Sequence, residues 1–274
     1  MKAIGIIETA PILANIVKLC SNQNVVKMAE IHCDVLCTPL QKVFPWASKE
    51  AIQYELLCNG LFQPFEWRCA ERLLQHEEIW SIVEQEYERL LALWQGPDVE
   101  IYILPITAGT PKKNGVAYPN GLFLFVSEML HVEELRALLA HEYNHICRLH
   151  YVKREPSQLA LQDSLVMEGL AECAVEELYG MRWLSPWTRR YTVEQIQPIW
   201  TEHFLPSLQL IDVEKHQPFL FGNYEKLPSW IGYCIGYRIV KSFQQANSFT
   251  SMQLLHMPTE VIVEGSILQK EGSS

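Results

Sequence analysis

The feature that most constrains this chain is a pair of histidines four residues apart, His141 and His145, with Glu142 between them. The residues just before them, 132–140, contain no glycine or proline, which predicts a helix through the motif. An α-helix turns about 100° per residue, so the two imidazoles lie one turn apart on one face and can converge on one ion. Glu142 points beside that ion. The pattern therefore predicts two zinc ligands and a carboxylate placed to take a proton from water.

A catalytic zinc ion needs a third protein ligand, and Glu168 is the candidate on a second predicted helix. Its nearest neighbours are apolar or small, and a carboxylate in such a setting is either paired or bound to something. Glu172 lies four residues on, on the same helix face. The alternative is a solvated acidic face, because further glutamates follow. His150 is rejected as a ligand, since a continuing helix places it about 180° from His141.

Composition bounds the class of protein. The chain has 274 residues, of which 49% are hydrophobic and 20% charged, with a formal net charge of −10. This is a globular composition without a basic cluster, so nucleic acid is not an expected partner. No run of about 18 apolar residues predicts a membrane span, and we find no signal peptide. Eight cysteines without a C-x-x-C pair suit free thiols in a reducing compartment, which predicts a cytoplasmic protein.

The first third of the chain predicts helices and carries no recognisable chemistry. The expected segments are 12–20, 25–38, 48–59 and a long helix near 66–95 that ends at Gly96-Pro97. His32, Cys33 and Cys37 are interpreted as core residues, because no fourth partner for a metal is apparent.

The pattern then changes to strands, expected at Val99–Pro105, Gly115–Tyr118 and Leu122–Val126, with turn signals at Asn114-Gly115 and Asn120-Gly121. We therefore expect a mostly helical α+β fold, with a small mixed or antiparallel sheet packed on the histidine helix. An edge strand there can pair with an extended substrate, although an ordinary packed sheet explains the pattern equally well. Residues 1–96 form an N-terminal helical region and residues 97–274 a second domain, unless the two are one continuous domain.

The remaining third predicts helices again. A helix capped by Asp163 or Ser164 runs to Gly180, Thr192–Gln195 forms a capping box, and Pro228-Ser229 opens a helix to about Gln245. In that last helix Gly232 and Gly236 recur at four-residue spacing beside Tyr233 and Tyr237. Close helix packing explains this repeat. The alternative is that one tyrosine hydroxyl reaches the metal site and hydrogen-bonds the developing oxyanion.

The motifs A-H-E-Y-N-H and M-E-G-L-A-E together resemble the gluzincin metallopeptidases. With G-Y-C-I-G-Y-R-I-V they are most similar to the YjaZ-like family of predicted bacterial zinc proteases, over roughly residues 99–243. This resemblance implies a zincin-like domain in which His141, His145 and Glu168 bind zinc and Glu142 is the base. It also implies that Glu172 supports a ligand histidine and that Asn120-Gly121 lies on a substrate-binding edge strand.

The expected activity is zinc-dependent hydrolysis of peptide bonds in a peptide or protein substrate, with one Zn²⁺ per chain. A water activated by the metal would attack the carbonyl, with Glu142 as general base. Two alternatives stay open at this point. One is a metal-containing binding or regulatory protein that cleaves little, and the other is a structural helical protein with a chance motif.

Overall fold

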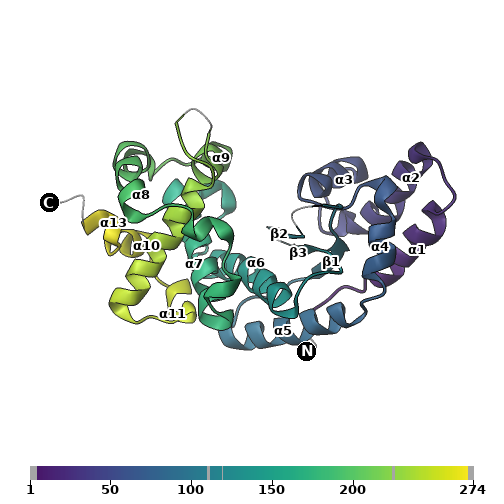
Figure 1. Cartoon of the computed structure of the whole chain (residues 1–274), viewed down its shortest axis with the longest axis horizontal. Helices are drawn as coiled ribbons and strands as arrows, with labels where there is room; N and C mark the ends of the chain where they lie inside the picture. Colours follow the sequence, from purple (N-terminus) through teal and green to yellow (C-terminus); the bar gives the residue numbers. More distant parts are fainter. Residues whose placement is uncertain (1–4, 110–111, 119, 224–225, 271–274) are drawn as a thin grey trace. The chain divides into compact units, whose positions relative to one another are not determined.

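The computed structural model describes residues 5–109, 112–118, 120–223 and 226–270. The fold is mostly helical α+β with a small mixed sheet, as the sequence predicts (Figure 1). The chain forms two compact units, one of Met1–Ala92 with Pro97–Tyr143 and the other of Leu93–Gly96 with Asn144–Ser274. The sheet belongs to the first unit, whereas the sequence analysis grouped it with the residues from 97 onward. No helix in the described ranges combines the length and the apolar character needed to cross a membrane.

The first unit contains helices and the sheet. Its helices are α1 (Ala10–Cys20), α2 (Val25–His32), α3 (Lys49–Cys58), α4 (Arg68–Leu73), most of α5 (Glu78–Trp94) and the first part of α6 (Val132–Val152). The predicted segments 12–20 and 48–59 are thus confirmed as α1 and α3. The segment 25–38 is helical too, but it changes after His32 from an α-helix to a π-helical turn, Cys33–Cys37.

The single long helix expected near 66–95 is wrong, because the chain breaks between α4 and α5. Leu73 is buried on α4, and Ile79 begins the buried stripe of α5. On one unbroken helix these side chains would point about 120° apart, since six residues turn the chain by about 600°. The break therefore lets both apolar stripes face the core of the unit.

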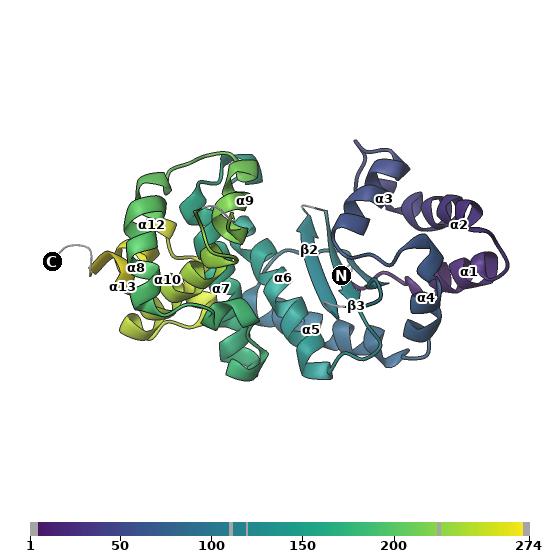
Figure 2. The ribbon, with the colours of Figure 1, turned by 45° about the horizontal axis from the view of Figure 1, so that its top comes forward.

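The sheet has the order β1-β3-β2, with β1 (Ile101–Pro105) parallel to β3 (Gly121–Val126) and β2 (Lys113–Tyr118) antiparallel to β3. Every residue of β3 is buried, as expected of an apolar strand with neighbours on both sides. Figure 2 shows β2 and β3 side by side next to α6. The edge strands of the sheet are therefore β1 and β2, and Ile6 forms an isolated bridge with Ile101 of β1. Asn120 lies in the turn before β3, and Gly121 opens the central strand rather than an edge strand.

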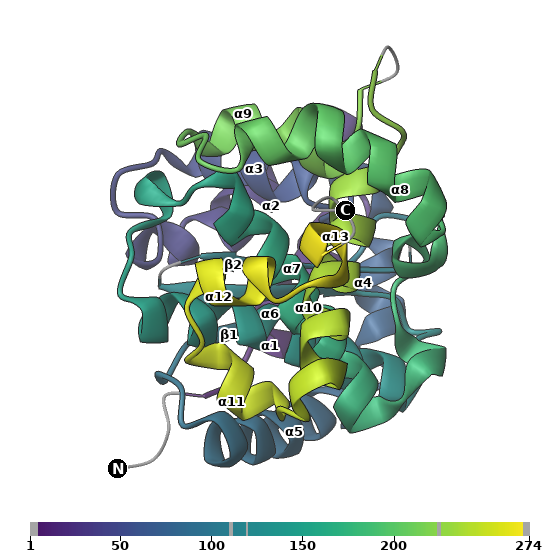
Figure 3. The same cartoon turned by 90° about the vertical axis from the view of Figure 1, so that its left-hand side faces the viewer.

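The second unit is built around α7 (Leu161–Tyr179), which is buried over most of its length. The elements that contact or follow it are α8 (Val193–Ile199), α9 (Val213–Phe221), α10 (Ile231–Asn247), α11 (Ser251–Leu255), α12 (Thr259–Glu264) and α13 (Ile267–Lys270). Figure 3, with this unit facing the viewer, shows α10 and α12 against α7. The capping box at Thr192–Gln195 is confirmed at the start of α8.

The start of α7 differs from the prediction. The helix begins two residues before the expected cap Asp163, directly after Ala160. Asp163 instead accepts the backbone N–H of Ala160 at 3.0 Å, so its carboxylate sits inside the first turn, where a negative charge is favourable. Gly180 ends the helix at a φ of 92°, as predicted.

Glycines allow α7 and α10 to approach at backbone distance. A Cβ on Gly236 would overlap the carbonyl oxygen of Leu165, and a Cβ on Gly169 would overlap the carbonyl of Gly236. The prediction that the glycine repeat of this helix serves close packing is confirmed.

Candidate metal centre

Helix α6 carries the His-Glu-x-x-His motif within an unbroken helix of 21 residues. Its N-terminal part is fixed in the first unit by ion pairs of Arg136 with buried Glu86 and of Glu134 with Lys113, both at 3.5 Å. Glu142 is buried, with 7% of its surface exposed, while His141 and His145 are partly exposed. The helix thus presents both imidazoles to a solvent-accessible side.

Glu168 of α7 joins the two histidines. One ligand atom from each of His141, His145 and Glu168 lies within 4.8 Å of the other two. Nε2 of His145 is 3.7 Å from a carboxylate oxygen of Glu168. No other group of three such side chains with this geometry occurs in the described residues. The structure therefore brings together the three residues that the sequence analysis selected as ligands.

The donor set fits zinc. Two imidazole nitrogens and one carboxylate oxygen are the ligands of many catalytic zinc ions, which keep a fourth position open. Tetrahedral ligands about 2.1 Å from zinc lie roughly 3.4 Å from one another. The 3.7 Å between Nε2 of His145 and the Glu168 carboxylate oxygen is close to this value.

Glu142 lies against the sheet edge. A Cβ added to Gly115 in β2 would fall 2.6 Å from both the carboxyl carbon and Oε1 of Glu142. The absence of a side chain at residue 115 therefore makes the space that the Glu142 carboxylate occupies. Gly115 is not among the predicted site residues, because Asn114-Gly115 was expected to form a turn and Gly115 only to open the strand Gly115–Tyr118. The available signal was a glycine inside a strand, which often marks close approach of another group.

Glu172 is one turn beyond Glu168 on α7 and is 2% exposed. Its carboxylate accepts the backbone N–H of Ser185 at 3.0 Å. This contact connects the segment after α7 to the acidic face of the helix. Glu176 and Glu177, further along α7, also have defined partners, Tyr237 with Lys241 and Ser251 respectively. The run of glutamates is thus a set of paired groups, not a uniformly solvated face.

The two tyrosines of α10 have different surroundings. The hydroxyl of Tyr237 donates to Glu176 at 2.8 Å, and burial raises the pKa of Tyr237 well above its usual range. Glu176 lies two turns past Glu168, about 12 Å along the helix. Tyr233 packs its ring among Trp187, Trp230 and Phe221.

The other candidate ligands lie elsewhere. His150 is exposed and packs against the ring of Tyr151. His32 is fully buried, with the Gln53 amide 2.8 Å from its Nδ1. All eight cysteines are free, and all but Cys58 are buried. These positions agree with the interpretation of His32, Cys33 and Cys37 as core residues.

Comparison with known proteins points to the same chemistry. A family model described as "Predicted Zn-dependent protease (DUF2268)" matches residues 79–264. The uncharacterized protein YjaZ of Bacillus subtilis (strain 168) is 31% identical over 201 residues, which cover 71% of this chain and 77% of YjaZ. The uncharacterized protein YjfC of the same organism is 26% identical over 140 residues, 46% of this chain and 45% of YjfC. No solved structure matches the chain.

The matched region contains α6, α7 and α10, and with them all three residues of the metal cluster. Family membership and the geometry of the cluster are independent observations that agree on a zinc site. The chain belongs to the family of predicted Zn-dependent proteases.

Proposed function

We propose that this protein is a gluzincin-type zinc metallopeptidase that hydrolyses peptide bonds at the site formed by His141, His145 and Glu168. The observation that carries the proposal is the convergence of these three side chains, with the Glu142 carboxylate one residue from His141 on the same helix. Membership of a family of predicted Zn-dependent proteases supports it. We propose one zinc ion per chain, because the described part of the chain contains one cluster of this kind.

A zinc ion bound there supplies a Lewis acid and lowers the pKa of water to about 7. Glu142 takes the proton of the attacking water and later passes it to the leaving amine. Its position against Gly115 supports this role, because the carboxylate is held in one place beside the ligand histidines. Of the two ligand histidines, His141 is the one that Glu172 is proposed to hold through an imidazole N–H, which would fix the ring tautomer; the burial of Glu172 one turn from Glu168 supports this role.

The substrate strand pairs with the sheet edge. In the described residues no strand pairs with β2 on the side away from β3, and Gly115 of β2 touches the proposed base. An extended polypeptide along β2 would therefore pass Glu142. We therefore propose that β2 binds the substrate, a role that the resemblance implied for Asn120 and Gly121. Asn120 lies in the turn before β3, and Gly121 lies in β3, the central strand that pairs with β2.

A tyrosine hydroxyl of α10 is proposed to stabilise the developing oxyanion. Tyr233 is the better candidate of the two, because the hydroxyl of Tyr237 lies at Glu176, about 12 Å along α7 from the proposed ligand Glu168. Such donors act by meeting charge that appears only in the transition state.

Metal analysis and a peptide digest test the function together. Purified protein is expected to contain about one zinc per chain and to cleave a degenerate peptide library. Cleavage should stop with a chelator, return with added zinc, and be absent in a Glu142→Gln variant that keeps the metal. Zinc without chelator-sensitive cleavage would show instead a metal-containing binding or regulatory protein. Protein that takes up no zinc would show that the motif is structural.

A further inference from the structure

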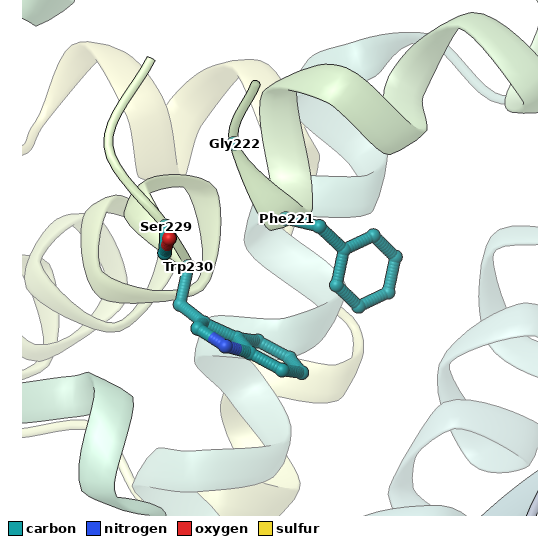
Figure 4. A pocket seen from close by; sticks show the side chains of 4 residues that line it. All are labelled: Phe221, Gly222, Ser229 and Trp230. Atoms are coloured by element: carbon teal, nitrogen blue, oxygen red, sulfur yellow. The ribbon is translucent and has the colours of Figure 1, made fainter. Parts of the chain in front are cut away.

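An aromatic pocket lies in the second unit, where α9 ends and α10 begins. Its volume is about 290 Å³, and it is lined by Phe221, Gly222, Ser229 and Trp230 (Figure 4). The rings of Phe221 and Trp230 meet edge to face with centroids 5.1 Å apart. Trp187 stacks on Trp230 at 4.7 Å, and Tyr233 packs against these rings. We refer to Trp187, Phe221, Trp230 and Tyr233 as the aromatic cluster.

The backbone at the pocket is held in an uncommon conformation. Trp230 has a φ of 64°, in the left-handed region that bulky residues rarely adopt. Its N–H donates to the Phe221 carbonyl at 2.8 Å, and the Tyr191 hydroxyl donates to the Ser229 carbonyl at 2.8 Å. Residues held in such conformations cluster at binding and catalytic sites. The fold therefore keeps the Trp230 ring at the pocket at some conformational cost.

Hydrogen bonds connect the pocket to α7, the helix that carries Glu168. Ser185, two residues before Trp187, donates its N–H to Glu172, one turn from Glu168. On α9, buried His216 lies 2.9 Å from the hydroxyl of Ser164, which is one turn before Glu168. The segment of Trp187, which stacks on the lining residue Trp230, and helix α9, which carries the lining residue Phe221, are thus each connected by a hydrogen bond to a turn of α7 next to Glu168.

We propose that the aromatic pocket accepts one aromatic or large aliphatic side chain of the polypeptide that the metal centre cleaves. This inference rests on the proposed function. A volume of 290 Å³ is just below the roughly 300–1,000 Å³ of small-molecule sites, which suits one side chain better than a whole ligand. None of the described residues that line the pocket is ionisable, so it offers no counter-charge to Lys, Arg, Asp or Glu. Aromatic rings make favourable contacts with apolar and aromatic side chains.

Cleavage specificity tests the proposal. The zinc-loaded protein is incubated with the degenerate peptide library, and the cleavage products are sequenced. We expect Phe, Tyr, Trp or Leu to be enriched at one position relative to the cleaved bond. Matched peptides with Phe or Gly at that position should differ in kcat/KM by about 10–200-fold. Enrichment of a charged residue, or no enrichment at any position, would overturn the proposal.

Phe221→Ala removes one wall of the pocket from an exposed site, so the fold should survive. The variant should lose most of the ratio between kcat/KM on the Phe peptide and kcat/KM on the Gly peptide. Val261→Ala, a similarly exposed apolar residue of α12, is the matched control and should keep the ratio. An unchanged ratio in Phe221→Ala would contradict the proposal.

A binding measurement separates this proposal from the proposed function. In Glu142→Gln protein labelled with 5-fluorotryptophan, the Trp230 signal is assigned by its loss in a Trp230→Phe variant. Increasing concentrations of the Phe peptide should shift the Trp230 signal until the shift saturates, and the Gly peptide should not shift it. A saturable shift without any cleavage by the parent would support the pocket while rejecting the peptidase. Cleavage by the parent with no shift would reject the pocket alone.

Discussion

Gly115 of β2 faces the side chain of Glu142 on α6 so closely that a single added methyl group would lie 2.6 Å from its carboxyl carbon. Both residues belong to the first unit, so this relationship does not depend on how the two units are arranged. The sheet edge thus sets the position of the residue proposed as general base. The overlap falls on Cγ and the carboxyl group of the Glu142 side chain, which can rotate, and not on rigid backbone.

Gly115→Ala is therefore expected to impair catalysis more than stability. The displaced Glu142 carboxylate should lower kcat by about 100-fold, because a 1 Å misplacement of a catalytic group can cost that much. The free energy of unfolding should change by less than about 1 kcal/mol, and zinc content should stay at the parent level. Steady-state kinetics, urea unfolding and metal analysis measure the three quantities.

Val116→Ala is the control for this experiment, because neighbouring residues of a strand point to opposite faces. It should leave kcat near the parent value. If Gly115→Ala retained full activity, the contact with Glu142 would have no part in positioning the base.

The cluster of His141, His145 and Glu168 was predictable from the sequence in part because one helical turn fixes the relation of the two histidines. His141 and His145 share a face on any α-helix, so their convergence needs no knowledge of tertiary structure. The prediction of Glu168 also required that a second helix pack against the first. The apolar neighbours of its carboxylate indicated that this group is paired or bound. The contact of Gly115 with Glu142 and that of Ser185 with Glu172 join different elements. A glycine inside a strand can indicate that another group approaches closely, but no local pattern identifies the partner.

The errors in the predicted fold have the same origin. Residues 66–95 have helical propensity throughout, but tertiary packing breaks them so that Leu73 and Ile79 can both be buried. The sheet order is also non-local, because β1 pairs with β3 and leaves β2 at the edge. The resemblance implied that Asn120-Gly121 lies on a substrate-binding edge strand, whereas Gly121 opens the central strand β3. Local sequence preferences for turns and strands do not determine which strand lies at the centre of the sheet.

Glu168→Ala should weaken zinc binding by at least 100-fold. Loss of residues that only support a ligand typically costs 10–100-fold in affinity, so loss of a ligand should cost no less. Glu177→Ala is the matched control, since it removes the same charge from the exposed end of the same helix. Competition with a chromogenic chelator measures the affinity. Equal affinities in the two variants would remove Glu168 from the ligand set.

Tyr233→Phe and Tyr237→Phe should have different effects. Removal of an oxyanion donor costs about 10²–10³-fold in kcat, which is the expected result for Tyr233→Phe. Tyr237→Phe loses a hydrogen bond to the Glu176 carboxylate, and such bonds contribute about 1.5–3 kcal/mol to stability. It should lower the unfolding midpoint in urea and leave kcat nearly unchanged. A large fall in kcat for Tyr237→Phe alone would show that Tyr237, and not Tyr233, is the oxyanion donor.

Gly236→Ala should destabilise the second unit. Its Cβ would overlap the carbonyl of Leu165, a backbone atom that cannot move without separating α10 from α7. Overpacking of this kind costs typically 1–3 kcal/mol. Gln245→Ala, on the exposed face of α10, should change the free energy of unfolding by less than about 0.5 kcal/mol. Urea unfolding of both variants compares them, and equal stabilities would show that the helices tolerate a wider separation.

His32 should make stability depend on pH in the acidic range. Burial lowers the pKa of His32 to about 4 in the folded protein, whereas an unfolded histidine titrates near 6.5. The neutral ring is thus favoured by folding, and the unfolded chain binds the extra proton between these values. The contribution of the neutral His32 ring to the free energy of unfolding is fully present above about pH 6.5. It is lost as the pH falls toward 4, in total about 3 kcal/mol.

His32→Gln keeps a polar side chain that cannot titrate. We therefore expect the variant to be less stable than the parent at pH 7, but to lose less stability by pH 4.5. Urea unfolding at both pH values gives this difference, and parallel losses in the two proteins would mean that His32 titrates normally in the core.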